Sequence, residues 1–240
     1  MSAEYIADLM PQLMQGLKIT VQLFVVTLVV SLPLGLVISL LREAAETPKS
    51  KNLLVIVVTF IVKWAIKLYL LVFRGTPLML QLFFVYFGLP NVILPGGGTI
   101  VLDMFPAAAV AFILNYAAYF AEIFRGGIIG VSKGQYEASK ALGFNMSQTM
   151  RLIVVPQMLR TVIPPIANET IILVKDTALA SSIALIDLLR VAQRAVNRDM
   201  NVAAYLIAAV IYLIITLVLT YIFHRIEKRL AISQVQNPAG

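Results

Sequence analysis

The chain has 240 residues, of which 60% are hydrophobic and only 13% are charged, and its net charge is +7. A soluble domain carries about 25% charged residues, so this composition excludes a soluble protein and indicates an all-α integral membrane protein. The positive charge does not indicate nucleic-acid binding, because Lys and Arg gather in short connections between apolar runs, as they do in cytoplasmic loops. With no Cys in the chain, disulfides and thiolate metal sites are excluded, and no metal site is expected.

The first predicted span covers about residues 17–41. Small and polar residues recur along it at helical spacing, and such a stripe allows two membrane helices to approach closely. The residues of this stripe are Thr20, Thr27, Ser31 and Gly35.

The next apolar region, residues 52–95, is interrupted by Lys63 and Lys67 and again at residues 74–77. Hydropathy alone allows two helices there. We predict an elbow helix on the inner membrane surface over about residues 49–62, followed by one span over about residues 66–88. Arg74 then lies near the middle of this span, where Gly75 and Pro77 loosen the helix and free backbone groups.

Three further spans are predicted over about residues 106–129, 156–182 and 203–223. Five spans place the N-terminus outside and the C-terminus in the cytoplasm. The inner connections then carry most of the Lys and Arg, whereas the outer loop over about residues 91–105 carries none. One segment disagrees with this topology, because a predicted outer helix over residues 187–201 carries an arginine every four residues. We interpret its face, formed by Arg190, Arg194 and Arg198, as interfacial or as part of an outer gate.

A recognisable pattern occupies the connection between the third and fourth spans, about residues 131–156. Its first part is a run of good helix formers whose apolar side Tyr136, Ala138, Ala141 and Leu142 can supply. Gly143 can adopt the positive φ that ends a helix. The sequence therefore predicts a short helix that projects from the membrane between two spans. The pattern is Glu137-Ala138-Ser139-Lys140-Ala141-Leu142-Gly143, nine residues, and then Ile153-Val154-Val155-Pro156.

This pattern resembles the EAA loop of permease subunits in ATP-binding-cassette (ABC) importers, with Ser139 in place of the second Ala and Val155 in place of Leu. The resemblance implies that the short helix docks in a groove of an ATPase subunit. It also implies two ATPase subunits, a second permease copy or close paralogue, an extracytoplasmic solute-binding protein, and a place among the lipids of the bacterial plasma membrane. The residues implied for coupling to the ATPase are Tyr136, Glu137, Ala138, Ala141, Leu142 and Gly143.

Three further regions resemble the permeases of polar amino acid importers of the histidine, glutamine and arginine type. They are FRGTPL at residues 73–78 with QLFF at 81–84, NYAAYFAEIFRGGI at 115–128, and PPIANE at 164–169 with KDTALAS at 175–181. The resemblance implies that residues 1–240 form one transmembrane permease domain. The chain has no G-x-x-x-x-G-K-[ST] sequence. We therefore expect a non-catalytic subunit without a cofactor of its own, with ATP and Mg bound by the partner ATPase.

Ionisable residues within the predicted spans are candidates for substrate binding, because a charge deep in a span costs at least ~2.5–3.5 kcal/mol. A zwitterionic amino acid needs a cation near its carboxylate, which Arg74 can supply as a bidentate fork, and an anion near its ammonium group. An alternative is that these charges only pair with one another and lock helices together, as Glu122 can do with Arg125. The candidate residues are Arg74, Asn115, Glu122, Asn168, Glu169 and Asp176.

Three other functions are alternatives to an amino acid permease. A permease for another small solute is an alternative, because the coupling loop is shared across the importers. An ion-coupled secondary transporter is disfavoured, because such proteins often contain internal repeats and none is evident in the sequence. A membrane enzyme would need a clustered nucleophile, base or metal site, and the single His, the absence of Cys and the absence of an H-E-x-x-H sequence argue against one.

Overall fold

The computed structural model describes residues 3–46, 52–92 and 98–235, with side chains described for all of these except residue 3 and residues 230–235. Within these ranges the chain forms α-helices joined by short 3-10 and π-helical turns, and no strand is present. The predicted all-α class is therefore confirmed.

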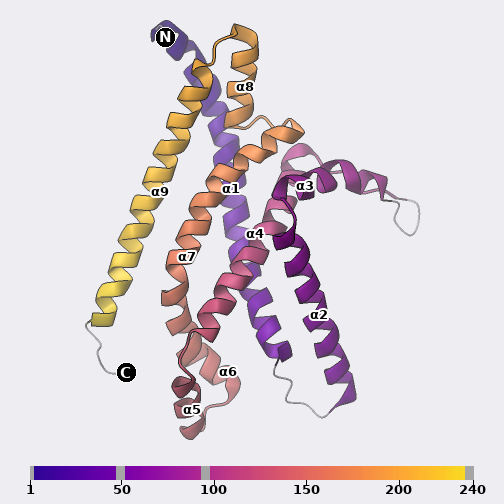
Figure 1. Ribbon diagram of the computed structural model, residues 1–240, viewed down its shortest axis with the longest axis vertical. Coiled ribbons are helices and arrows are strands. Elements are labelled where there is room, and N and C mark those ends of the chain that lie inside the picture. Colours follow the sequence, from indigo (N-terminus) through magenta and orange to yellow (C-terminus); the bar gives the residue numbers. More distant parts are fainter. Residues whose placement is uncertain (1–2, 47–51, 93–97, 236–240) are drawn as a thin grey trace.

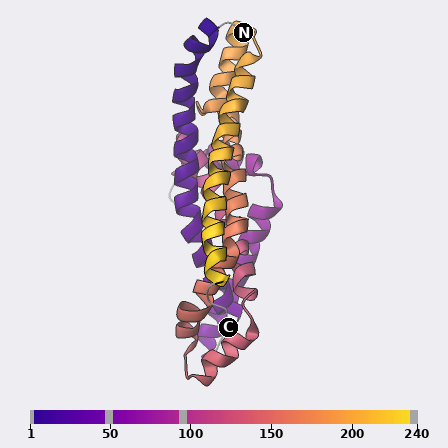
Figure 2. The same cartoon turned by 90° about the vertical axis from the view of Figure 1, so that its left-hand side faces the viewer.

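Five long helices run along the long axis of the molecule and alternate in direction (Figure 1). As a result, the N-terminal end of α1 and the C-terminal end of α9 lie at opposite ends of the structure. Seen from the side, the molecule is long and narrow, and the short helices α5 (Lys133–Ala141) and α6 (Met146–Thr149) extend beyond the ends of the long ones (Figure 2). The five are α1 (Ala3–Glu46), α2 (Leu53–Gly75), α4 (Met104–Ile129), α7 (Val155–Asp176) and α9 (Ala203–Val235).

Four helices of the described chain, α1, α2, α4 and α9, are long and apolar enough to cross a membrane. The helix α7 is long enough, but Arg160, Glu169, Lys175 and Asp176 lower its hydropathy. The alternation of the five helices agrees with an odd number of crossings, and the five-span count with the N-terminus outside stays a prediction.

The region around α2 differs from the sequence-based prediction of an elbow helix followed by a separate span. Residues 49–51 of the predicted elbow lie outside the described residues, and residues 53–75 form one continuous helix. Pro and Gly are the residues that break helices, and neither occurs in α2 before Gly75. Lys63 and Lys67 therefore lie within the helix and do not interrupt it. The break comes at Thr76 and Pro77, and α3 (Leu78–Phe83), a π-turn (Phe84–Gly88) and a 3-10 turn (Leu89–Asn91) follow. Arg74 therefore lies in the last turn of α2 and not in the middle of a span.

Among the described residues, α1 makes its most extensive helix contact with α4, and at the N-terminal end of its polar stripe the hydroxyl of Thr20 accepts a hydrogen bond of 3.0 Å from the amide of Leu188 in α8 (Leu188–Asp199). Thr20, Thr27 and Ser31 are completely buried. A Cβ atom at Gly35 would lie 3.0 Å from the backbone oxygen of Ala117 in α4. The predicted close approach is confirmed, and its reason is that small side chains on both helices let the backbones come together.

The connection between α7 and α9 contains a 3-10 turn (Thr177–Ile183) and the helix α8 (Leu188–Asp199). Asp187 caps α8, because its side chain accepts a hydrogen bond from the Arg190 amide, 2.8 Å away. The helix packs on α1 and α9, where Leu188 and Ala192 are buried. Arg194 and Arg198 are exposed.

Candidate functional site

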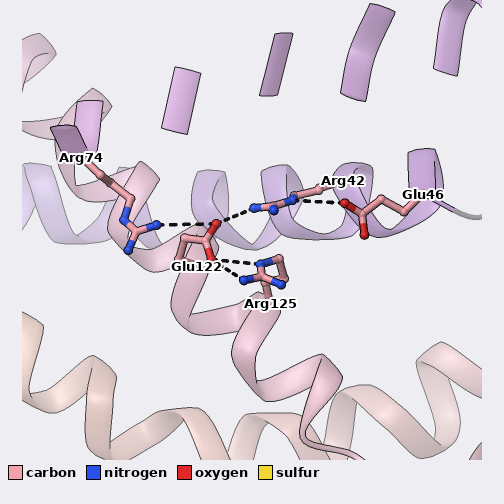
Figure 3. A network of polar contacts seen from close by, with 5 residues as sticks. All are labelled: Arg42, Glu46, Arg74, Glu122 and Arg125. Atoms are coloured by element: carbon pink, nitrogen blue, oxygen red, sulfur yellow. Dashed lines mark hydrogen bonds and ion pairs between the residues drawn. The ribbon is translucent and has the colours of Figure 1, made fainter. Parts of the chain in front are cut away.

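Glu122 of α4 lies at the centre of a group of charges drawn from three helices (Figure 3). Its carboxylate accepts hydrogen bonds from Arg42 of α1 and from Arg125, one turn along α4, and the Arg125 contacts measure 2.9 Å. Arg74 of α2 lies 3.6 Å from the same carboxylate. Glu46 adds a second, more exposed carboxylate 3.7 Å from Arg42. The predicted pairing of Glu122 with Arg125 is confirmed, and the group joins α1, α2 and α4.

A pocket of about 430 Å³ opens beside this group of charges. Its volume falls within the range of small-molecule sites, and three cations and one carboxylate contribute to its wall. The lining residues are Arg42, Lys67, Leu70, Leu71, Arg74, Gly75 and Glu122.

The side chain of Asn115 in α4 forms hydrogen bonds at the break between α2 and α3. Its side-chain amide donates to the carbonyl of Phe73 at 2.8 Å and to the side-chain oxygen of Gln81 at 3.0 Å. Gln81 donates in turn to the carbonyls of Phe73 and Thr76. Pro77 has no amide hydrogen to donate, and these two side chains satisfy carbonyls freed at the end of α2. Asn115 is 4% exposed, so its first role in this structure is to hold the helix break.

Two carboxylates of α7, Glu169 and Asp176, lie near one another in the same region. Asp176 accepts a hydrogen bond of 2.7 Å from Tyr116 of α4. Glu169 is half-buried and lies within electrostatic range of both Asp176 and Arg74. The guanidinium of Arg74 lies over the ring of Tyr119, 5.6 Å from its centroid. Arg74 therefore lies 3.6 Å from Glu122 and within electrostatic range of Glu169.

The structure brings four of the six predicted residues into one charged region, namely Arg74, Glu122, Glu169 and Asp176. Asn115 lies beside that region in the helix break, and Asn168 is exposed on α7. Sequence reasoning missed Arg42, Gln81 and Tyr116 as members. Tyr119 shares a helix face with Asn115 and Glu122, as helical spacing predicts, whereas Tyr116 directly follows Asn115 and lies on another face, so that spacing does not identify it. Arg42 sits at the end of the first apolar run, and nothing in the sequence indicates its partner on α4.

The predicted short helix is present as α5 (Lys133–Ala141), at the opposite end of the molecule from the N-terminus (Figure 1). Gly143 has φ of +78°, as predicted. The Gly143 amide donates to the Lys140 carbonyl and the Phe144 amide donates to the Ser139 carbonyl. This pair of bonds is a Schellman motif, which ends a helix sharply and satisfies its last carbonyls.

The two faces of α5 differ in what they contact. Ser139 is 1% exposed and its hydroxyl accepts a hydrogen bond of 3.0 Å from Thr149, which fixes α5 to the following helix α6 (Met146–Thr149). In contrast, Ala138, Ala141 and Leu142 point away from the chain, and Leu142 is 73% exposed. Tyr136, expected on the same apolar side, is instead half-buried against the chain. The small Ser in place of the second Ala therefore lies on the inner face of the helix, and the exposed side carries the apolar Ala138, Ala141 and Leu142 together with Glu137 and Lys140.

The last turns of α1 contact this loop. A pocket of about 260 Å³ lies between them and is lined by Leu40, Glu43, Ala44, Met146, Ser147 and Met150. Burial and the nearby carboxylate of Glu43 raise the pKa of Tyr136. The end of α1 that carries Arg42 is therefore in contact with both the Glu122 group and the loop.

Comparisons with known proteins identify the family. The family model described as "Binding-protein-dependent transport system inner membrane component" matches residues 55–232. The arginine transport system permease protein ArtQ of Bacillus subtilis (strain 168) is 39% identical over 92% of this chain and 93% of its own. The glutamine transport system permease protein GlnP of Escherichia coli (strain K12) is 36% identical over 92% and 94%.

A solved structure described as an amino acid ABC transporter with histidines superposes with a TM-score of 0.81 at 30% identity, covering 95% of this chain and 99% of the other. The inward-facing MetNI methionine ABC transporter superposes with a TM-score of 0.69 at 18% identity, which shows the shared fold. It covers 96% of this chain and 99% of its own. The chain therefore belongs to the binding-protein-dependent transport system inner membrane components, which are the permease subunits of ABC importers.

Proposed function

We propose that this permease imports a polar amino acid across the bacterial plasma membrane and is driven by ATP hydrolysis in a separate pair of ATPase subunits. The observation that carries the proposal is the α5 helix, which ends in a Schellman motif and exposes an apolar face at one end of the molecule. Relatives named as arginine, cystine and glutamine permeases support the choice of an amino acid.

Coupling to the ATPase would proceed through the outer face of α5. Ala138, Ala141 and Leu142 offer an apolar surface that a groove on another protein can cover. The opposite face is fixed to α6 through Ser139 and Thr149, so a push on α5 moves the loop as a unit. One chain supplies one such helix. Two ATPase subunits therefore require a second permease, which is either another copy or a close paralogue, and an external binding protein delivers the solute.

The substrate site would lie around Arg74, on the side that faces α7. The guanidinium can bind the α-carboxylate in a bidentate manner, and Tyr119 holds that guanidinium by a cation–π contact. Glu169 and Asp176 are the carboxylates available to an ammonium group, and Glu169 is already in electrostatic range of Arg74. Asn115 and Glu122 then keep Arg74 in position through the helix break and the ion pair, and Asn168 contributes from the exposed face of α7.

The proposal is tested with the assembled importer in proteoliposomes, by measuring ATP-driven uptake of a panel of amino acids, sugars, peptides and inorganic ions. A polar amino acid should be transported, and Arg74→Ala and Glu169→Gln should reduce its uptake more than tenfold while the complex still assembles. Uptake of only a sugar, a peptide or an inorganic ion would refute the amino acid assignment and favour a permease for another solute. Normal uptake by both assembled variants would make Arg74 and Glu169 structural residues.

The coupling role is tested separately with Leu142→Ser and a matched control. Loss of this exposed apolar side chain should weaken association with the ATPase by more than tenfold, because most of its surface is free to be buried by a partner. Val202 is also strongly exposed, at 67%, but it lies directly before α9 and away from α5. Val202→Ser should therefore leave association unchanged. Equal association of the ATPase with both variants would contradict docking through α5. Uptake driven by an ion gradient without ATP would instead indicate a secondary transporter.

A further inference from the structure

The wall of the pocket beside Glu122 contains three cationic side chains and one carboxylate, so its net charge is positive. Arg42, Lys67 and Arg74 line it together with Glu122, and Glu122 is also shared with Arg125 outside the pocket wall. Within the part of the chain that the structure describes, Lys67 forms no ion pair. Its ammonium lies over the ring of Trp64, 5.1 Å from the centroid. The pocket is therefore suited to an anion that Lys67 can approach.

The rest of the pocket wall is apolar, and the face of α2 beside it is exposed. Leu70 and Leu71 line the pocket itself, and Leu68, Leu71 and Val72 of the same helix are 61%, 71% and 43% exposed. In a membrane protein such a face contacts acyl chains. A ligand with an anionic head and apolar chains would satisfy both the cations and this face, whereas a small soluble anion would satisfy only the cations.

The position of the pocket along the molecule agrees with a lipid headgroup. It is lined by Arg42 of the last turns of α1 and by residues 67–75 of α2, and the end of α1 beside it is the one in contact with the loop of α5 and α6. Under the predicted topology this is the cytoplasmic side, where basic pockets between membrane helices bind anionic headgroups. Trp64 next to Lys67 is the pairing of an aromatic and a basic residue that anchors helices at the membrane interface.

We propose that this pocket binds the phosphate group of an anionic phospholipid, with Arg42 and Lys67 around the phosphate and the acyl chains along α2. Glu122 keeps Arg42 oriented toward the pocket. The proposal goes beyond amino acid import, because Lys67 has no part in the proposed substrate site. A bound lipid would hold α2 against α1 next to the contact between α1 and the coupling loop.

The test measures lipid binding to the assembled importer by native mass spectrometry, with phosphatidylglycerol, phosphatidylcholine and inorganic phosphate added in separate arms. Wild-type protein should prefer phosphatidylglycerol over phosphatidylcholine. Lys67→Gln should weaken phosphatidylglycerol binding about fivefold, the effect of one basic residue near a membrane surface. Lys67→Arg should retain binding. The matched control is Lys63→Gln, which changes the same charge one turn away on α2 and outside the pocket wall, and should also retain binding.

Several results would overturn the proposal. Equal phosphatidylglycerol binding by the wild type and Lys67→Gln, or an equal loss in Lys63→Gln, would show that the pocket is not the site. Displacement of the lipid by inorganic phosphate at comparable concentration would assign the pocket to free phosphate. If Lys67→Gln fails to assemble, Lys67→Arg and the wild-type preference decide: no preference for phosphatidylglycerol over phosphatidylcholine would reject the lipid assignment. None of these outcomes depends on amino acid uptake.

Discussion

Gly35 of α1 lies directly against Phe120 of α4, because a Cβ atom placed on Gly35 would stand 2.7 Å from the Cβ of Phe120. Backbone atoms of Ala117 and Ala121 would be 3.0 Å away. The contact sits in the middle of the α1–α4 packing, and no flexible side-chain end is available to move aside. The two helices are therefore packed at a distance that only glycine allows.

We predict that Gly35→Ala destabilises the protein by about 1–3 kcal/mol, the usual cost of adding volume to a filled interior. Gly35→Leu should prevent accumulation of folded protein in the membrane. Thermal unfolding of the purified protein in detergent measures the first effect. The control is Gly126→Ala in α4, where a Cβ would meet nothing within 4 Å, and its unfolding temperature should stay the same or rise slightly. A stable Gly35→Leu protein would contradict the packing of α1 on α4.

Glu122→Gln should destabilise the protein by about 3 kcal/mol, because Arg42, Arg74 and Arg125 would lose the charge that they share in a region only 17% exposed at the Glu122 side chain. Glu46→Gln is the matched control. Glu46 also pairs with Arg42, but it is 37% exposed and 3.7 Å away, and exposed pairs contribute about 0–1 kcal/mol. Thermal unfolding compares the two. Equal losses of stability would mean that Glu122 is not the centre of the group.

Much of the fold could be predicted from the sequence because apolar length and helical spacing act locally. The α4 helix begins and ends within two residues of its predicted span, and Gly143 ends α5 with the positive φ expected of it. The stripe of Thr20, Thr27 and Ser31 is buried as expected. In each case the chain itself carries the signal, either as periodicity or as a residue type with a special backbone preference.

The sequence-based prediction was incomplete where tertiary contacts, and not the local sequence, determine the structure. The charges of Lys63 and Lys67 suggested a break in α2, but a long basic side chain can stay in a helix and extend its charged end, so only Gly75 and Pro77 end it. The partners of Asn115 at Phe73 and Gln81 depend on how α3 folds back onto α4, and its role in substrate binding stays a prediction. Which arginine reaches Glu122 is likewise set by helix packing and not by spacing along the chain.

Gly143 can be tested by its backbone conformation alone, because a Cβ at this position would meet nothing within 4 Å. A β-branched residue at φ of +78° costs about 1–2 kcal/mol. Gly143→Val should therefore loosen the end of α5 and reduce ATP-driven uptake. Asn tolerates the left-handed region, so Gly143→Asn should retain most of the activity. The measurement is uptake per assembled complex, and equal activity of the two variants would show that the end of α5 does not matter for coupling.

The predicted topology can be tested by the accessibility of single cysteines, since the native chain has none. Thr99, in the exposed connection before α4, should react with a membrane-impermeant thiol reagent from outside intact cells when changed to Cys. Lys133, at the start of α5, should react only after the cells are permeabilised. Both positions are exposed in the structure, so burial cannot explain a difference. The reverse pattern of labelling would invert the orientation, and labelling of both from outside would reject a membrane crossing by α4, which lies between the two positions.

Asp187 should make the protein less stable as the pH rises from about 4 to 6. Burial raises the pKa of this carboxyl group, at the start of α8 between α7 and α9, from 3.8 to about 6. Below pH ~4 the carboxyl is protonated in the folded and unfolded states alike and has no effect on stability. Between these values the unfolded chain ionises and the folded chain does not, so the folded state loses up to about 3 kcal/mol by pH 7.

Asp187→Asn isolates this effect, because Asn has the same shape, does not titrate and caps helices about as well as Asp. The stability of the variant relative to the wild type should rise with pH over this window and level off above pH ~6. Thermal unfolding of both proteins at pH 4, 5, 6 and 7.5 measures the difference, and comparing the two removes contributions from all other titrating groups. A difference that stays constant with pH would mean that the Asp187 carboxyl ionises at its ordinary pKa in the folded protein.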